Sequence, residues 1–153
     1  MGPDGFQTFQ DLVVWQEARK FRRRMYELAK RLPDCERFNA ASQIRRAALS
    51  VTNNIAEGHG RYHYQENIQF LRQARGSLEE LMDDLTLCQD EQYASASELA
   101  ALTTAATGVH RLLNGYIRYL REKKAATSNL AREALALYET DTNEFADDDP
   151  VSL

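Results

Sequence analysis

The sequence predicts an all-α protein: an antiparallel, up-down-up-down four-helix bundle followed by a partly disordered acidic C-terminal tail. Leucine, alanine, glutamate and arginine recur at helical spacing over most of the 153 residues. Only three prolines and seven glycines are present, so few positions interrupt a helix. With 43% hydrophobic residues, a single domain of this length can bury a core without disulfides or a metal.

We expect a loose lead-in over residues 1–8 and the bundle over residues 9–124. The first helix runs from about Gln10 to Leu32. Pro33 ends it, because proline has no amide hydrogen and clashes with the preceding turn. The core-facing stripe of this helix consists of Val14, Ala18, Phe21, Met25, Leu28 and Leu32.

Two further surfaces are expected on the same helix. A strip beside the core stripe is either the edge of a wide core or a contact between subunits; it contains Trp15, Arg22 and Tyr26. The exposed side is strongly basic and is our candidate nucleic-acid contact, because such a surface can follow a phosphate backbone. Its cations are Arg19, Lys20, Arg23, Arg24, Lys30 and Arg31.

The basic side of the first helix also has a simpler explanation. It can be a solvated surface whose charge is neutralised by acids of the third helix. In an up-down-up-down bundle the first and third helices run in the same direction, so their second halves lie at the same end. The acids in question are Glu79, Glu80, Asp83 and Asp84.

The second helix is expected from about Asn39 to Glu57. Asn39 or Ser42 can cap its start, and Gly58 and Gly60 end it because glycine tolerates the left-handed conformation. Its core stripe is Ile44, Ala47, Ala48, Val51 and Ile55. The opposite face carries polar and small side chains three and four residues apart, and we interpret it as the surface by which one bundle recognises its copies. These side chains are Gln43, Arg46, Ser50, Asn53, Asn54 and Glu57.

The third helix is expected from about Tyr64 to Glu91 and the fourth from about Ala96 to Lys124, the latter opened by a capping box of Ser95 and Glu98. Both have the alternating three-four spacing of bundle packing. The third helix buries Leu71, Ala74, Leu78, Leu81, Leu85 and Cys88. The fourth buries Leu99, Leu102, Ala106, Val109, Leu113, Tyr116 and Leu120. Cations at the end of the fourth helix suit the helix dipole and add to the candidate phosphate contacts.

Residues 125–153 are expected to form the tail, with a short helix over Ser128–Tyr138 and a disordered acidic end. The tail accounts for the acidic balance of the chain. The net charge is −4, but residues 1–124 hold 18 Lys and Arg against 16 Asp and Glu and so carry +2. The total charge therefore understates how basic the folded part is.

The sequence predicts neither a catalytic site nor a cofactor, because it lacks nucleophile, phosphate-loop and dinucleotide-binding motifs. Cys35 and Cys88 are too few for a disulfide framework or a zinc site. Cys88 lies on the core stripe of its helix and is interpreted as a small core residue. His59 and His63 are four residues apart and could hold a surface metal, but their expected loop position favours solvated histidines.

Targeting signals are also missing from the sequence. No basic start is followed by an apolar run, and no stretch approaches the ~20 apolar residues of a membrane span. We therefore expect a soluble cytoplasmic protein that does not contact a membrane.

Four motifs together resemble a known family. They are F-x-x-L-x-x-W-Q from Phe9, Q-I-R-R-A from Gln43, N-I-A-E-G from Asn54 with Arg61 after it, and G-S-L-x-E-L from Gly76. Over about residues 6–124 the chain is similar to the four-helix bundle proteins encoded in intervening sequences of bacterial 23S ribosomal RNA genes. The same group includes the accessory variability proteins of diversity-generating retroelements.

The resemblance implies a barrel-like homopentamer of four-helix bundles. For the retroelement branch it implies binding of a reverse transcriptase and of nucleic acid, RNA or DNA, through basic surface. We therefore expect a non-enzymatic homopentamer that acts as an accessory to nucleic-acid machinery. The alternative is a structural or protein-binding oligomer of the intervening-sequence type that binds no nucleic acid. The matching motif residues are Arg45, Arg46, Asn54, Glu57 and Arg61.

Overall fold

The computed structural model describes the backbone of residues 8–144 and the side chains as far as residue 137. All regular structure in this range is helical. In chain order the elements are η1 (Phe9–Asp11), α1 (Val13–Arg31), η2 (Asp34–Glu36), α2 (Ala40–His59), α3 (Tyr64–Asp90) and α4 (Ala96–Glu144).

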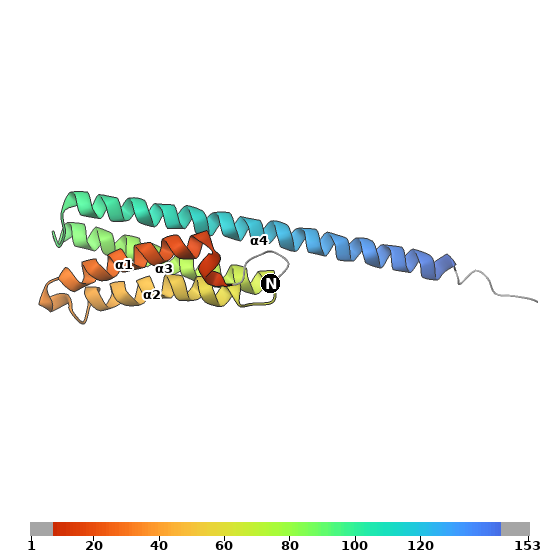
Figure 1. Cartoon of the computed structure of the whole chain (residues 1–153), viewed down its shortest axis with the longest axis horizontal. Helices are drawn as coiled ribbons and strands as arrows, with labels where there is room; N and C mark the ends of the chain where they lie inside the picture. The colour runs from red at the N-terminus through yellow and green to blue at the C-terminus, as the bar shows by residue number, and fades with distance from the viewer. Residues whose placement is uncertain (1–7, 145–153) are drawn as a thin grey trace, which may run out of the picture.

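The four long helices form the predicted up-down-up-down bundle (Figure 1). Helices that follow one another along the chain pack side by side, and α1 closes the bundle by packing against α4. Within the described residues α1 makes no such contact with α3, so these two helices occupy opposite corners of the bundle. Their outward surfaces therefore face in opposite directions.

The core confirms the predicted stripes. Every residue of the stripes on α1, α2 and α3 is buried. On α4 one position differs: Tyr116 is only partly buried, and Ile117 takes its place in the core with 3% of its surface exposed. A step of four residues from Leu113 to Ile117 keeps the stripe facing the bundle axis, because a helix turns once every ~3.6 residues.

Helix α1 begins three residues later than expected. A separate 3-10 turn precedes it, held by a capping box between Thr8 and Asp11. The backbone amide of Gln10 donates to the Thr8 hydroxyl (3.2 Å), and the amide of Thr8 donates to the Asp11 carboxylate (3.1 Å). The remaining predicted lead-in, residues 1–7, lies outside the described residues.

The start of α2 is capped differently from the prediction. Neither Asn39 nor Ser42 provides a side-chain cap. Instead the Glu36 carboxylate accepts from the amide of Ala40 (3.2 Å) and from the side chain of Asn39 (2.9 Å). It also accepts from the hydroxyl of Tyr93 (2.9 Å), which ties the α1–α2 link to the α3–α4 turn.

Gly58 does not end the second helix as predicted, but has a packing role instead. It is buried inside α2, which continues to His59, and neither Gly58 nor Gly60 adopts the left-handed conformation. A Cβ atom at Gly58 would lie 2.7 Å from Oδ1 of Asn67 and 3.0 Å from Cβ of Phe70. Gly58 is therefore required by the close approach of α2 and α3.

The end of the fourth helix was predicted incorrectly. Helix α4 does not stop at Lys124 and resume at Ser128; it is one helix of 49 residues that ends at Glu144. Alanines 125 and 126 favour the helix, and the Thr127 hydroxyl donates to the carbonyl of Lys123 (3.0 Å) one turn back. The expected acidic disordered end, residues 145–153, lies outside the described residues.

Candidate nucleic-acid and assembly surfaces

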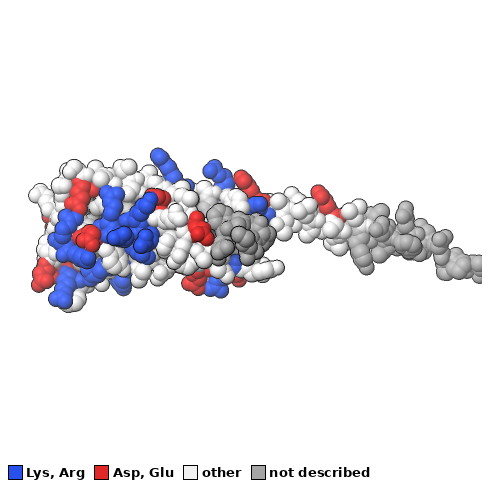
Figure 2. All heavy atoms as spheres, in the orientation of Figure 1, with Lys and Arg blue, Asp and Glu red and all other residues white. Residues whose placement is uncertain are grey.

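The six predicted cations of α1 all lie on the exposed side of the bundle, and we call this surface the basic face. Figure 2 shows Lys and Arg side chains gathered over α1. Arg19, Arg23 and Arg24 occupy its middle and N-terminal part, and Lys30 and Arg31 its C-terminal end. The core stripe on the other side of α1 fixes this orientation.

Three cations of the basic face have carboxylate partners. Lys20 pairs with Glu17 (2.6 Å) and Lys30 with Glu27 (2.9 Å), each three residues away on the same helix. The hydrogen bond and charge of Lys30 lower the pKa of Glu27. Arg31 forms an ion pair across the bundle with Glu98, in the first turn of α4.

Arg19, Arg23 and Arg24 form no ion pair with any described residue. The predicted neutralisation of the basic face by acids of α3 is wrong. These acids lie on the helix diagonally opposite α1, and the acids that pair with the cations of α1 come from α1 itself and from α4.

The strip beside the core stripe of α1 is used largely within the chain. Trp15 is partly buried and meets the ring of Phe9 edge to face, with ring centroids 5.2 Å apart. Arg22 donates through Nη1 to the hydroxyl of Thr52 (2.7 Å), a buried residue of α2. Tyr26 lines a groove between α1 and α2 beside Leu49, which is 41% exposed.

The polar face predicted on α2 divides into two parts. Ser50 and Asn54 are half-buried, and Ser50 joins α2 to α3, since the Ser50 and Ser77 hydroxyls are 2.8 Å apart. The amide of Asn54 donates to the carbonyl (2.9 Å) and hydroxyl (3.0 Å) of Ser50. The other four residues are exposed: Gln43, Arg46, Asn53 and Glu57. Of these, Glu57 pairs with Arg61 (2.7 Å).

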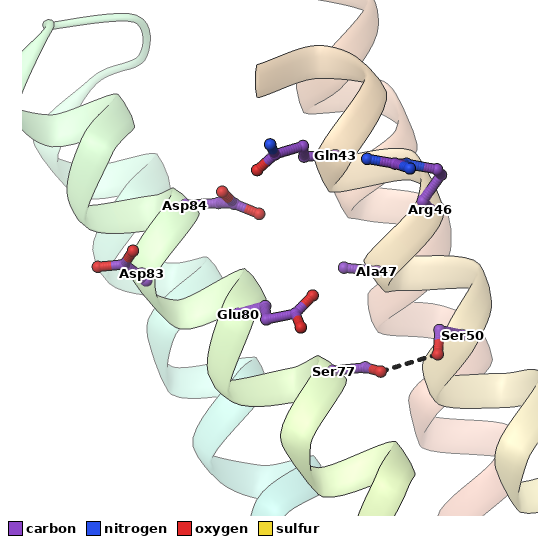
Figure 3. A pocket seen from close by; sticks show the side chains of 8 residues that line it. All are labelled: Gln43, Arg46, Ala47, Ser50, Ser77, Glu80, Asp83 and Asp84. Atoms are coloured by element: carbon purple, nitrogen blue, oxygen red, sulfur yellow. Dashed lines mark hydrogen bonds between the residues drawn. The ribbon is translucent and has the colours of Figure 1, made fainter. Parts of the chain in front are cut away.

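An acidic groove lies between α2 and α3 above the serine pair (Figure 3). Gln43 and Arg46 line one wall. Glu80 and Asp84 point into the groove from the other wall, and Asp83 turns away from it. Desolvation, together with the negative charges of Asp83 and Glu80, raises the pKa of Asp84 to about 6. The charge of this wall attracts cations and repels phosphate.

The sequence does not reveal the acidic groove, because its residues belong to two separate predicted surfaces. Gln43, Arg46 and Ser50 belong to the predicted polar face of α2, and the acids belong to the set expected to neutralise α1. Their juxtaposition depends on how α2 and α3 are rotated against each other. The only local signal is the small Ser77 opposite the small Ser50, which allows the two helices to approach there.

The two cysteines differ in their surroundings. Cys88 is buried in the core, where desolvation raises the pKa of its thiol to about 11, and Cys35 is exposed. His110 instead joins α4 to α3, with Nε2 3.0 Å from a carboxylate oxygen of Glu79. Among the described residues, no three His, Cys, Asp or Glu side chains are grouped so that they could hold a metal ion.

None of the described helices is both long enough and apolar enough to cross a membrane. The 49 residues of α4 include many charged side chains, particularly after Leu120.

Comparison with known proteins gives a family match and a structural match. The family model described as 23S rRNA-intervening sequence protein matches residues 10–115. The fold is similar to the 1.70 Å crystal structure of a protein of unknown function from the S23 ribosomal protein family of Bacteroides thetaiotaomicron, with a TM-score of 0.65 and 24% identity over 69% of this chain and 98% of that chain. At this identity the likeness shows the fold alone. No curated protein matches the chain.

Proposed function

Because the chain belongs to the 23S rRNA-intervening sequence protein family, we propose that it is a non-enzymatic, homo-oligomeric bundle protein that binds RNA as an accessory to nucleic-acid machinery. The observation that carries the proposal is the basic face of α1, on which Arg19, Arg23 and Arg24 have no carboxylate partner among the described residues. Guanidinium groups bind phosphate through paired hydrogen bonds, so such a surface suits a nucleic-acid backbone.

The spacing of the three arginines supports a continuous contact. Arg19 and Arg23 are four residues apart and lie about 6 Å from each other along the helix. Arg24 lies beside Arg23 on the same exposed arc. The three arginines can therefore contact neighbouring phosphates of one strand without any bending of the helix. Lys20 and Lys30 add to the attraction, because exposed ion pairs such as theirs contribute only about 0–1 kcal/mol and are readily exchanged.

The charge distribution also limits where RNA can bind. The acidic groove is formed partly by α3, the helix diagonally opposite α1. Its carboxylates repel a phosphate backbone at that surface. We therefore place the proposed phosphate contacts on the α1 side of the bundle.

Filter binding with a short single-stranded RNA and an RNA hairpin, at several salt concentrations, tests the proposal. The triple substitution Arg19→Ala, Arg23→Ala and Arg24→Ala is expected to weaken binding at low salt. Each lost phosphate contact reduces the slope of log affinity against log salt by about 0.7 to 0.9, so the triple variant should reduce it by roughly 2 to 3. Binding of a DNA strand of the same length shows whether the protein distinguishes ribose from deoxyribose.

A matched control removes three cations elsewhere: Arg72→Ala, Arg111→Ala and Arg132→Ala, on α3 and α4. We expect it to retain most of the affinity, and circular dichroism should show unchanged helix content in both variants. If the unmodified chain fails to bind RNA at low salt, or if both triple variants bind equally well, the α1 contact is refuted.

Self-assembly is the second part of the proposal. Five copies, as the sequence resemblance implies, would have a mass of about 88 kDa for a chain of 17.5 kDa, which light scattering can measure. A measured mass equal to that of one chain would refute self-assembly. A reverse transcriptase is proposed as a protein partner of the oligomer, tested by co-purification of the two proteins with and without RNA.

A structural or protein-binding oligomer without RNA is the second candidate. The observation that favours it is the groove between α1 and α2, where Tyr26 and the exposed side chain of Leu49 form an apolar strip beside the basic face. Leu49→Gln should lower the assembled mass if copies meet there. Because it adds no charge beside Arg23 and Lys30, which line the same groove, it should change any RNA affinity per chain little.

A further inference from the structure

Residues 121–144 of α4 form a projecting helix, which we call the arm. As far as residue 137, Leu120 is the last buried residue of α4, and every residue from 121 to 137 is exposed. Figure 1 shows the arm extending well past the ends of α1, α2 and α3. At ~1.5 Å per residue, its length is about 36 Å. Its base touches α3 through a hydrogen bond that Nζ of Lys124 donates to Oε1 of Gln65 (2.8 Å). Beyond Lys124, the described side chains of the arm are all exposed.

The arm lies beyond the part of the chain that the family model matches. The family match ends at residue 115, and the related crystal structure is covered over 98% of its length by 69% of this chain. The function proposed above is based on α1. Whatever the arm does is therefore additional to that function.

One side of the arm is apolar although nothing in the described chain covers it. Leu130, Leu135 and Leu137 are 66%, 57% and 68% exposed. Thr127 and Ala131 continue the helical line of Leu113, Ile117 and Leu120, and form a seam of small residues between the leucines. Most of the stability of a protein helix comes from packing of its apolar side, so this side favours a partner helix.

The charges of the arm are arranged asymmetrically along its length. Its first four residues contain Arg121, Lys123 and Lys124 against one acid. No Lys or Arg follows Arg132, whereas the last six residues include Glu139, Asp141 and Glu144. The arm is therefore basic at its base and acidic at its tip.

This asymmetry identifies both the partner and its direction. A second arm aligned in parallel would place basic base against basic base and acidic tip against acidic tip. An antiparallel second arm places each tip beside the opposite base, so both ends attract. Such a contact has two-fold symmetry and uses the same surface on both copies.

The end of the bundle from which the arm projects also suits this arrangement. Val13, Tyr62, Tyr64 and Tyr119 are exposed apolar or aromatic residues at this end. In an antiparallel pair of arms, the tip of each arm reaches the bundle end of the other copy. Exposed apolar residues gathered at one end of a bundle suit contact with a partner.

We propose that the arm is a docking helix that pairs antiparallel with the arm of a second copy and joins two bundles, or two rings of bundles, end to end. The proposal concerns a different surface from the RNA contact, and each can fail without the other.

Light scattering of the full-length chain tests the pairing. The substitutions Leu130→Glu and Leu137→Glu place two carboxylates on the apolar side and are expected to halve the assembled mass. For two rings of five 17.5 kDa chains, the mass would fall from about 175 kDa to the roughly 88 kDa of one ring. The control, Ala125→Glu with Asn129→Glu, adds the same charge to the polar side of the arm and should keep the unmodified mass. If both variants have the same mass as the unmodified chain, the arm does not pair and the proposal is overturned.

Disulfide trapping tests the direction. If the arms are centred on each other between Arg132 and Glu133, residue 127 of one copy lies opposite residue 138 of the other. Thr127→Cys and Tyr138→Cys are made separately in chains that carry Cys35→Ser; Cys88 is buried and can stay.

Antiparallel arms predict a cross-link only when the two cysteine variants are mixed. Along the helix the two positions are about 16 Å apart, too far for a disulfide within a parallel, in-register pair. Parallel arms would instead make each variant cross-link with itself, and that result would contradict the proposed direction.

Discussion

Oδ1 of Asn67 lies 2.7 Å from the position that a Cβ atom of Gly58 would occupy. Helices α2 and α3 therefore cross at a point where one of them must have no side chain. Gly58 is the last residue of the N-I-A-E-G motif, so the structure gives this motif residue a packing role.

We expect Gly58→Ala to destabilise the protein, because the added methyl group meets Asn67 and the Cβ atom of Phe70, neither of which can move freely in a helix. Overpacking of this kind costs about 1–3 kcal/mol, which thermal unfolding can measure. Gly76→Ala is the matched control. It lies in α3 with nothing within 4 Å of its added Cβ atom, and Ala should stabilise the helix there by about 0.5–1 kcal/mol. Equal effects of the two substitutions would contradict the close approach.

Asp84→Asn should stabilise the protein at neutral pH. The folded-state pKa of Asp84, about 6, lies above its ordinary value of 3.8. The folded state thus favours the protonated form, and the stabilisation is complete below pH 3.8 and is lost as the pH rises through 6. Because the group is half-exposed, we reduce the full linkage value to a gain of about 1 kcal/mol at pH 7.

Urea unfolding at pH 7 and at pH 3.5 checks the expectation for Asp84: the gain should be present at the first pH and absent at the second. Glu133→Gln, which changes an exposed acid in the interior of α4, away from the helix ends, serves as the control. A gain that is independent of pH would show that charge at Asp84 is not its cause.

Glu36 should make folding sensitive to acid. Its hydrogen bonds from the Ala40 amide and then from Tyr93 lower its pKa in the folded state. Its contribution is therefore present above pH 4.5, the ordinary value, and is lost as the pH falls through the lowered pKa. Glu36→Gln should flatten this part of the pH profile of unfolding. Tyr93→Phe, which removes only the second donor, should flatten it less; no change in either variant would count against the cap.

The two cysteines should differ sharply in reactivity. Cys35 is exposed, whereas Cys88 is buried and burial raises the pKa of its thiol to about 11. Because the thiolate is the reactive form, iodoacetamide should label Cys35 in the folded protein and Cys88 only after unfolding. Mass spectrometry of the labelled chain decides this. Rapid labelling of Cys88 under native conditions would mean that α3 opens locally.

The helices and their core stripes could be predicted from the sequence because the pattern that defines them is local. Residues such as Leu71, Leu78 and Leu85 recur with the period of one helix, whatever lies beside it. The position of the basic face followed directly, since it is the side of α1 opposite the core.

The tertiary structure decided which elements face one another. Diagonal placement separates α1 from the acids of α3 and leaves Arg31 to pair with Glu98, and the rotation of α2 against α3 forms the acidic groove. It also determined that Gly58 is a packing residue and that α4 continues as an arm. Periodicity reports the side of a helix that is buried. It does not report the neighbour that buries it, because that depends on contacts between residues far apart in the chain.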